Sequence, residues 1–165
     1  MNINNHFENL NYNEAYGFEG EISIDFFEKS INVDLIVNTE EEEIADIQFE
    51  TYERFKEKWP ELQKAVIEKI LKYYNEEEKG SYGPDNKEEF NKWWPEINTT
   101  EELLEQIELD GIIIPEAFVM EDAIGGRCLY LLFSKKWGND IEDNGIGIQI
   151  VNEEINQIGY KDIAF

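Results

Sequence analysis

One short acidic segment has the ligand spacing of a calcium-binding loop. Asp140, Glu142 and Asn144 stand where an EF-hand loop places its ligands 1, 3 and 5, and Gly145 stands at the position of the invariant glycine. An EF-hand also requires a bidentate glutamate at position 12, where this chain has Val151. The flanking residues have the pattern of strands rather than helices. We therefore expect a surface loop ending in an Asn-Gly hairpin turn, and weak cation binding by this loop stays open as the alternative.

Few other side chains have a pattern suited to catalysis or metal binding. The chain has one histidine, His6, and one cysteine, Cys128. A zinc site or a nucleophile with a histidine base needs more of these residues than the chain supplies. Cys128 lies in an apolar run that ends at Phe133, so we expect a buried structural thiol. The sequence predicts no catalytic residue, no metal site and no cofactor.

Carboxylates are so abundant that their positions do not single out a catalytic pair. The chain has 38 Asp and Glu against 14 Lys and Arg, a formal net charge of −24 over 165 residues. Hydrolysis by two carboxylates requires a defined separation across a cleft, which spacing in the sequence does not supply. A hydrolase with an unrecognised carboxylate pair is therefore kept as an alternative function.

The net charge favours one class of partner. A protein this acidic repels nucleic acid and anionic membranes and attracts basic proteins. Interface anchors are often Trp or Tyr, and acidic residues surround the paired tryptophans of this chain. We predict that a basic protein partner contacts the following residues: Glu88, Glu89, Trp93, Glu96, Asp140, Glu142 and Asp143.

Composition indicates a folded single domain despite the charge. Hydrophobic residues make up 41% of the chain and aromatic residues 13%, which suffices for a core. We expect one domain over residues 1–165, with residues 1–16 as a loose N-terminal arm. The first residues lack the pattern of a signal peptide, and no apolar run approaches the ~20 residues that span a bilayer. These features predict a cytoplasmic protein.

The first third of the chain has the alternation of strands. Apolar and acidic residues alternate over 17–27 and again over 31–37, which predicts a hairpin with its turn at 28–30. The glutamate run 40–43 is typical of a solvated loop. A third short strand is predicted over 44–49.

Helical spacing follows over residues 51–78. Because proline removes a backbone donor, we expect two helices there, one over 51–58 and one that begins at Pro60. A shorter helix is predicted after Thr99 or Thr100 as N-cap, ending at a turn formed by Asp110 and Gly111.

The last third is rich in strands. We expect strand-like structure over 112–120, a turn at 125–126 and a central buried strand over 127–133. A terminal hairpin pairs 145–151 with 155–160. The order of strands, helices and strands predicts an α+β fold, a single domain with a mostly antiparallel sheet and helices packed on one face.

The C-terminal end has a recognisable succession of motifs. An apolar strand, Leu131-Leu132-Phe133, leads to Trp137, an acidic stretch, the hairpin motif Gly145-Ile146-Gly147-Ile148 and a final Gly159-Tyr160-Lys161-Asp162. This succession resembles a family of small uncharacterised bacterial acidic domains that are similar to immunity proteins. The resemblance implies a place among toxin and immunity genes, and it implies no catalytic residue.

These observations together predict a non-enzymatic acidic protein-binding domain. The function we expect is that of an immunity protein that neutralises a basic toxin such as a nuclease, because a carboxylate surface can cover the Lys and Arg with which a nuclease holds phosphates. The alternatives are a housekeeping or structural domain of the bacterial cytoplasm and the hydrolase named above. The sequence predicts no oligomeric state.

Overall fold

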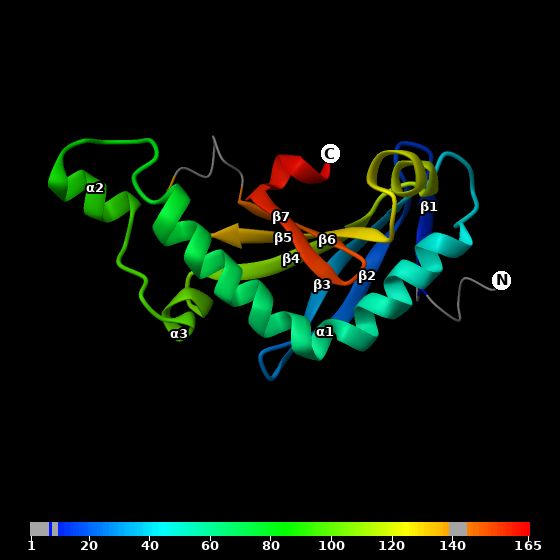
Figure 1. Ribbon diagram of the computed structural model, residues 1–165, viewed down its shortest axis with the longest axis horizontal. Helices are drawn as coiled ribbons and strands as arrows, with labels where there is room; N and C mark the ends of the chain where they lie inside the picture. The colour runs from blue at the N-terminus through cyan, green and yellow to red at the C-terminus, as the bar shows by residue number, and fades with distance from the viewer. Residues whose placement is uncertain (1–6, 8–9, 139–144) are drawn as a thin grey trace.

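A computed structural model describes residues 7, 10–138 and 145–165 of the chain. Its strands form one sheet in chain order, and a long helix crosses that sheet (Figure 1). The strands are β1 (Asn11–Asn13), β2 (Gly17–Phe26), β3 (Lys29–Asn38), β4 (Ile107–Ile114), β5 (Cys128–Lys135), β6 (Ile146–Val151) and β7 (Glu154–Tyr160). The helical segments are α1 (Asp46–Tyr73), the π-helix η2 (Tyr74–Glu78), α2 (Lys87–Trp93), α3 (Thr100–Leu104), the π-helix η3 (Val119–Ile124) and the 3-10 helix η4 (Lys161–Ala164). All neighbouring strands are antiparallel except β3 and β4, which confirms the predicted single α+β domain with a mostly antiparallel sheet.

The β2–β3 hairpin has the predicted alternation. Ile22 lies opposite Val33 on the face that packs against α1, and Glu21 lies opposite Asp34 on the other face. The turn itself is formed by Phe27 and the residue after it, Glu28, with φ values of +47° and +69°. Positive φ at both central residues matches the twist of the two strands, so the turn is tighter than the predicted 28–30.

The helix α1 corrects two predictions. The predicted strand over 44–49 is wrong because the helix already begins at Asp46, and the predicted break at Pro60 is wrong because the helix continues to Tyr73. Figure 1 shows that α1 changes direction about half-way along its length, the part of the helix in which Pro60 stands. A proline within a helix costs about 3 kcal/mol. Burial of Trp59 and Leu62 on either side, each worth about 2 kcal/mol, offsets that cost.

Part of the predicted loose N-terminal arm is ordered structure. Asn11–Asn13 forms β1 and pairs with the start of β2. Phe7 is fully buried, with its ring centroid 5.2 Å from that of Phe49 and 4.6 Å from that of Tyr52, both on α1. Aromatic packing against α1 therefore holds this end of the chain on the helix.

The middle of the chain differs from prediction at both ends of β4. The predicted turn at 110–111 lies inside β4, as a bulge between Leu109 and Gly111. The predicted strand-like run over 112–120 ends at Ile114, and the residues after Pro115 are helical. Thr99 is confirmed as the cap of α3, because its Oγ1 accepts a hydrogen bond of 3.1 Å from the N–H of Glu102.

The strand β5 is confirmed as a central buried strand. It lies between β4 and β6, and Leu129, Leu131 and Phe133 are at most 1% exposed. Cys128 is fully buried, and burial raises the pKa of its thiol to about 11. A structural thiol is therefore the correct interpretation of this cysteine.

The face of the sheet away from α1 is partly covered by η4. Gly147 and Gly159 lie opposite each other on β6 and β7, and Ile163 packs over both. A Cβ at either glycine would lie within 3.1 Å of the Ile163 side chain. Across residues 7, 10–138 and 145–165, no helix combines the length and the apolar character needed to cross a membrane.

Candidate functional site

The most distinctive surface feature is a pocket of about 420 Å³ at the end of the sheet where β3 and β4 finish. Five glutamates line it, and we call this feature the Glu pocket: Glu40, Glu41, Glu43, Glu116 and Glu121. The loop between β3 and α1 contributes the first three, and the segment after β4 contributes the other two. Phe118 lies among them and is 50% exposed.

Parallel pairing of β3 with β4 creates this site. Val37 lies beside Ile114, so both strands finish at the same edge of the sheet. The buried side chain of Gln48, in the first turn of α1, joins the two ends: its Nε2 donates to the carbonyl oxygen of Asn38 at 2.7 Å and to that of Pro115 at 3.0 Å. A single amide therefore fixes both acidic segments to the start of the helix.

The segment after β4 turns its acidic and aromatic side chains outward because one methionine anchors it. The carbonyl oxygen of Glu116 accepts from the N–H groups of Val119 and Met120, which starts a helical turn directly after Pro115. Met120 is fully buried, and its sulfur lies 3.6 Å from the Thr51 hydroxyl of α1. With Met120 inside, Phe118 and the glutamates near it face the pocket and solvent.

The electrostatics of the Glu pocket favour a cationic hydrogen-bond donor. Among the described residues, none of the five glutamates forms an ion pair, and two oxygens that line the pocket, Oε2 of Glu116 and Oγ1 of Thr39, are buried without a hydrogen-bond partner. A buried unsatisfied acceptor costs about 1–3 kcal/mol. Burial, and secondarily the charge of Glu40, raises the pKa of the Glu116 carboxyl. A bound cationic donor would supply the missing hydrogen bonds and would reduce the repulsion between Glu116 and Glu40.

Substitution of Glu116 by glutamine is expected to stabilise the fold at neutral pH. Because the pKa of Glu116 is higher in the folded than in the unfolded chain, its ionised form disfavours folding above that pKa, and the penalty disappears as the pH falls and the carboxyl is protonated in both states. We expect Glu116→Gln to raise the free energy of unfolding at pH 7 and to have no effect near pH 3.5. Urea unfolding at the two pH values measures this, with Glu121→Gln as the control at an exposed glutamate. An equal gain from both variants at pH 7 would contradict the assignment of the shift to burial.

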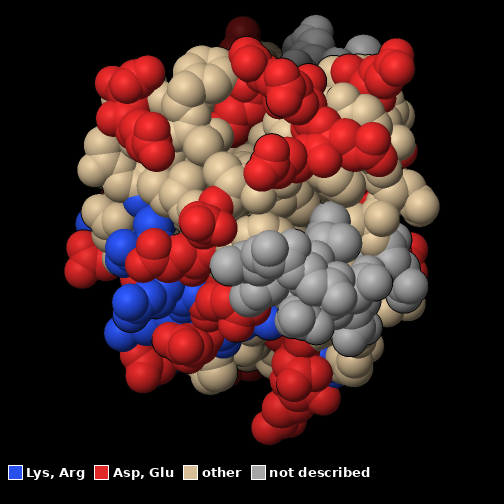
Figure 2. Space-filling model, turned by 90° about the vertical axis from the view of Figure 1, so that its right-hand side faces the viewer, with Lys and Arg blue, Asp and Glu red and all other residues tan. Residues whose placement is uncertain are grey.

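The surface around the Glu pocket is acidic over a wider area. Figure 2 shows the end of the molecule that carries the loop after β3 and η3, and Asp and Glu side chains cover much of its upper part. Lys and Arg side chains are gathered lower on the left of the same view. The upper part of this end of the molecule is therefore predominantly acidic, and a basic partner would be attracted to it on approach.

The sequence-predicted contact residues that the structure describes lie together on and beside α2. Figure 1 places α2 at the end of the molecule opposite η3, and hence far from the Glu pocket. Glu88 and Glu89 form the first turn of α2, where their N–H groups donate to the Asn86 side chain that caps the helix. Trp93 is half-buried, with its ring in edge contact with that of Tyr82 at 5.8 Å between centroids.

Two of these acids already have a cationic neighbour. Lys92 lies 3.3 Å from Glu89, and Lys79 lies 2.7 Å from Glu96. Glu88 has no ion pair in the described part of the chain. The other predicted contacts, Asp140, Glu142 and Asp143, lie outside the described residues. The contact role of this surface stays a prediction.

A buried ion pair accounts for one member of the acidic run at 76–78. Glu78, in η2, is fully buried and bonded through its Oε1 to Nζ of Lys135 at the end of β5. The indole N–H of Trp137 donates to the same oxygen at 3.1 Å, and the ring of Tyr74 packs against that of Trp137 at 4.7 Å. This group joins the end of α1 to the sheet, so it serves the fold and adds nothing to the acidic surface.

One family matches the chain, namely the domain of unknown function DUF6985, over residues 6–165. The chain belongs to this family. The match to DUF6985 covers both the Glu pocket and α2, and it includes no link between DUF6985 and immunity proteins. No curated protein and no solved structure matches this DUF6985 domain.

Sequence reasoning missed the glutamates after β4. The residues 117–120 were expected to continue a strand, which would have pointed alternate side chains away from any pocket. The available signals were Pro115, which is suited to ending a strand, and Gly125, whose φ of +76° ends a helical segment in this DUF6985 domain. The loop 40–43 was expected to be solvated, and only the fold places it beside Glu116.

Proposed function

We propose that this domain is a non-enzymatic acidic protein-binding domain whose partner is a basic protein, and that the Glu pocket receives a Lys or Arg side chain of that partner. The observation that carries the proposal is the set of five glutamates around the half-exposed ring of Phe118, none of which pairs with a Lys or Arg of the described residues. A guanidinium offers five donors to carboxylates and stacks on aromatic faces, so it is the group that such a pocket fits best.

The arrangement of the carboxylates favours an organic cation over a metal ion. Calcium requires six or more oxygens that converge at 2.3–2.6 Å. Within residues 7, 10–138 and 145–165, no group of three or more acidic, His or Cys side chains is placed to hold a metal ion. Carboxylates spread around a pocket of about 420 Å³ suit a larger, delocalised cation.

The net charge of −24 supports fast association with a basic protein. Complementary charge raises the rate of encounter and suppresses wrong partners, which is what an inhibitor of a toxin requires. We therefore propose more narrowly that the domain is an immunity protein that covers the phosphate-binding Lys and Arg of a nuclease toxin. Co-expression with the product of the neighbouring upstream gene tests this narrower proposal, since the domain should restore growth that the toxin alone arrests.

Two charge-matched triple variants test the general proposal. One replaces Glu40, Glu116 and Glu121 by glutamine in the Glu pocket, and the other replaces Glu88, Glu89 and Glu96 by glutamine at the predicted α2 surface. Each removes three negative charges, so a difference between them reports the site rather than the net charge. The probe is a nine-residue peptide in which Arg alternates with Gly, titrated by calorimetry at 20 mM and 300 mM salt.

We expect the Glu pocket variant to bind the probe about tenfold more weakly than the unmodified domain at 20 mM salt, a loss of about 1.4 kcal/mol. The α2 variant should lose less than threefold, and binding by both should weaken as salt is added. A larger loss of affinity in the α2 variant would contradict the Glu pocket as the binding site and would favour the surface predicted from the sequence. Equal losses of affinity in the two variants, or binding that does not depend on salt, would contradict the proposed binding site. The acidity would then serve solubility alone.

Hydrolysis is a second candidate because of one observation. Glu116 and Glu40 line the same pocket, and the pKa of Glu116 is raised by burial and, to a smaller extent, by the charge of Glu40. Carboxylates with shifted pKa values in a pocket are candidates for acid–base catalysis. Turnover of p-nitrophenyl esters or glycosides that Glu116→Gln and Glu40→Gln each abolish would establish an enzyme. The absence of turnover in the unmodified domain would leave the binding function as the proposal.

A further inference from the structure

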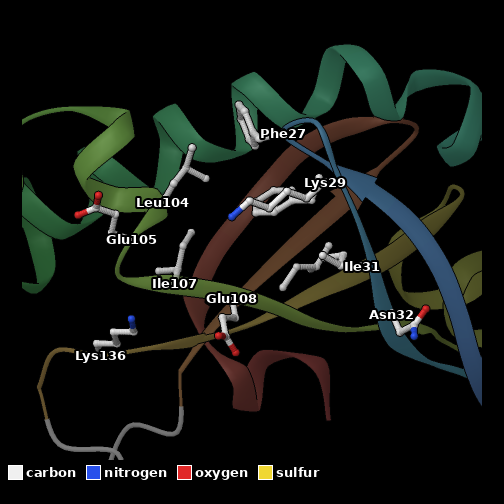
Figure 3. Close-up of a pocket in the computed structure, with 11 residues that line it drawn as sticks. Phe27, Lys29, Ile31, Asn32, Leu104, Glu105, Ile107, Glu108 and Lys136 are labelled. Atoms are coloured by element: carbon white, nitrogen blue, oxygen red, sulfur yellow. The ribbon is translucent and has the colours of Figure 1, made fainter.

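A second pocket, independent of the Glu pocket, opens at the other end of the β3–β4 pair. It has a volume of about 450 Å³ and lies between the beginnings of the two strands, with the end of α3 on one side (Figure 3). We call it the strand-gap pocket, and six of its lining residues are Phe27, Lys29, Ile31, Ile107, Glu108 and Lys136.

The gap follows from the way the two strands pair. β3 and β4 are in register only over Asp34–Val37 and Gly111–Ile114, and the bulge between Leu109 and Gly111 separates the earlier residues of β4 from β3. The first half of β3 therefore pairs with β2 on one side and faces the gap with the other. Backbone groups along such an edge remain available for hydrogen bonds to a ligand.

The lining of the strand-gap pocket combines apolar side chains with charged ones, among them two lysines and two glutamates. Phe27 and Ile31 from the hairpin face Leu104 and Ile107 from the α3–β4 connection. Ile107 belongs to the main core and the other three pack against it, and the N–H of Phe27 donates a 2.8 Å hydrogen bond to Oε1 of Gln63 on α1. The walls are therefore fixed by the core, and the space between them suits an apolar body.

Two lysines line this pocket, in a chain that has few Lys and Arg residues. Four of the Lys and Arg residues have no carboxylate of the described residues within 4 Å, namely Lys29, Lys69, Lys87 and Lys136, and two of these four line the strand-gap pocket. Figure 3 shows the amine of Lys29 reaching into the space between β3 and β4. The carboxylate of Glu105, which also lines the pocket, points away from that space in the same view.

We infer that the strand-gap pocket binds an amphipathic organic acid, with its apolar body against Phe27, Ile31 and Ile107 and its anionic group on Lys29, while Lys136 adds positive charge on the other side of the pocket. A volume of about 450 Å³ lies in the range of small-molecule sites and holds a chain of about ten carbons or a bicyclic aromatic acid. Lysine amines without an internal carboxylate partner, set beside an apolar wall, are complementary to such a ligand. This site is separate from the surface that would meet a basic protein.

Decanoate serves as the probe, measured by calorimetry and by displacement of the fluorescent anion 1-anilinonaphthalene-8-sulfonate. We expect decanoate to bind in a 1:1 ratio and to displace the fluorophore, and we expect decanol, which has the same chain without the charge, to bind at least tenfold more weakly. The double variant Lys29→Ala/Lys136→Ala should lose at least tenfold in affinity for decanoate. Its matched control is Lys69→Ala/Lys87→Ala, which removes the same charge elsewhere and should lose less than twofold.

A third variant separates the pocket from its charges. Ile31→Trp keeps both lysines and fills the apolar space, so it should abolish displacement while near-ultraviolet circular dichroism reports an intact fold. Equal binding of decanol and decanoate, equal losses in the two lysine double variants, or unchanged binding by folded Ile31→Trp would each overturn the inference.

Discussion

Replacement of Lys135 by methionine is expected to lower the free energy of unfolding by about 3–5 kcal/mol, the largest effect of any single substitution considered for this domain. Both Lys135 and Glu78 have fully buried side chains, and they bond to each other. Loss of the lysine would leave a carboxylate charge in the interior, with the indole N–H of Trp137 as its remaining hydrogen-bond donor among the described residues. The cost arises from that uncompensated charge rather than from the lost attraction alone.

A double variant distinguishes this cause from simple loss of packing. Glu78→Leu combined with Lys135→Met removes both charges, and we expect it to recover at least half of the stability that Lys135→Met loses. Lys161→Met is the matched control, because Lys161 pairs with Asp110 at 3.0 Å in a partly exposed setting and should cost about 1 kcal/mol or less. Urea unfolding of the four proteins measures the set. A loss for Lys135→Met no larger than that for Lys161→Met would contradict the buried-charge account.

Replacement of Gly17 by alanine is expected to cost about 3 kcal/mol. Gly17 begins β2 with a φ of +109°, a conformation that side chains rarely adopt. A Cβ there would lie 2.6 Å from the backbone nitrogen of Thr39 and against the carbonyl oxygen of Val37. Because both atoms belong to the backbone of the neighbouring chain segment, the strands would have to separate.

The same substitution at Gly125 provides the control for Gly17. Gly125 has a φ of +76°, and a Cβ there would meet nothing within 4 Å. Gly125→Ala should therefore cost only the conformational strain, about 1 kcal/mol. Thermal and urea unfolding of both variants test the comparison, and equal costs would show that close approach at Gly17 does not contribute. Since Thr39 lines the Glu pocket, Gly17→Ala should also weaken binding of the Arg-containing probe.

Sequence patterns predicted the strands and hairpins more accurately than the helices. The two-residue alternation of β2 and β3, and the apolar run of β5, follow directly from which face or faces of a strand are buried. The prediction of a helix break at Pro60 was wrong because it considered local sequence and not tertiary packing. The known destabilisation by proline refers to an isolated helix. In this fold, burial of Trp59 and Leu62 against the sheet outweighs that destabilisation and keeps α1 continuous.

The candidate sites were less predictable because they combine residues that are distant in the sequence. The sequence pattern favoured the region of Glu88 and Trp93, where acidic and aromatic residues are close in the chain. In the structure, other acidic residues of that region form ion pairs with neighbouring lysines. Glu40 and Glu116 come together only because β3 and β4 run parallel and finish at one edge. No period or motif in either segment encodes that proximity.

The sequence by itself determined the class of the protein. Net charge, the absence of a nucleophile with a base, and alternating strands are sums or local patterns, and they are sufficient to predict an acidic α+β domain with a basic partner as the expected ligand. Only the three-dimensional fold sets which glutamates gather in one pocket, which glutamate is buried against Lys135, and where the sheet opens beside two lysines that have no ion pair with the described residues. The physical reason is that charge and hydropathy act residue by residue, whereas a site depends on distances that only strand pairing and core packing set.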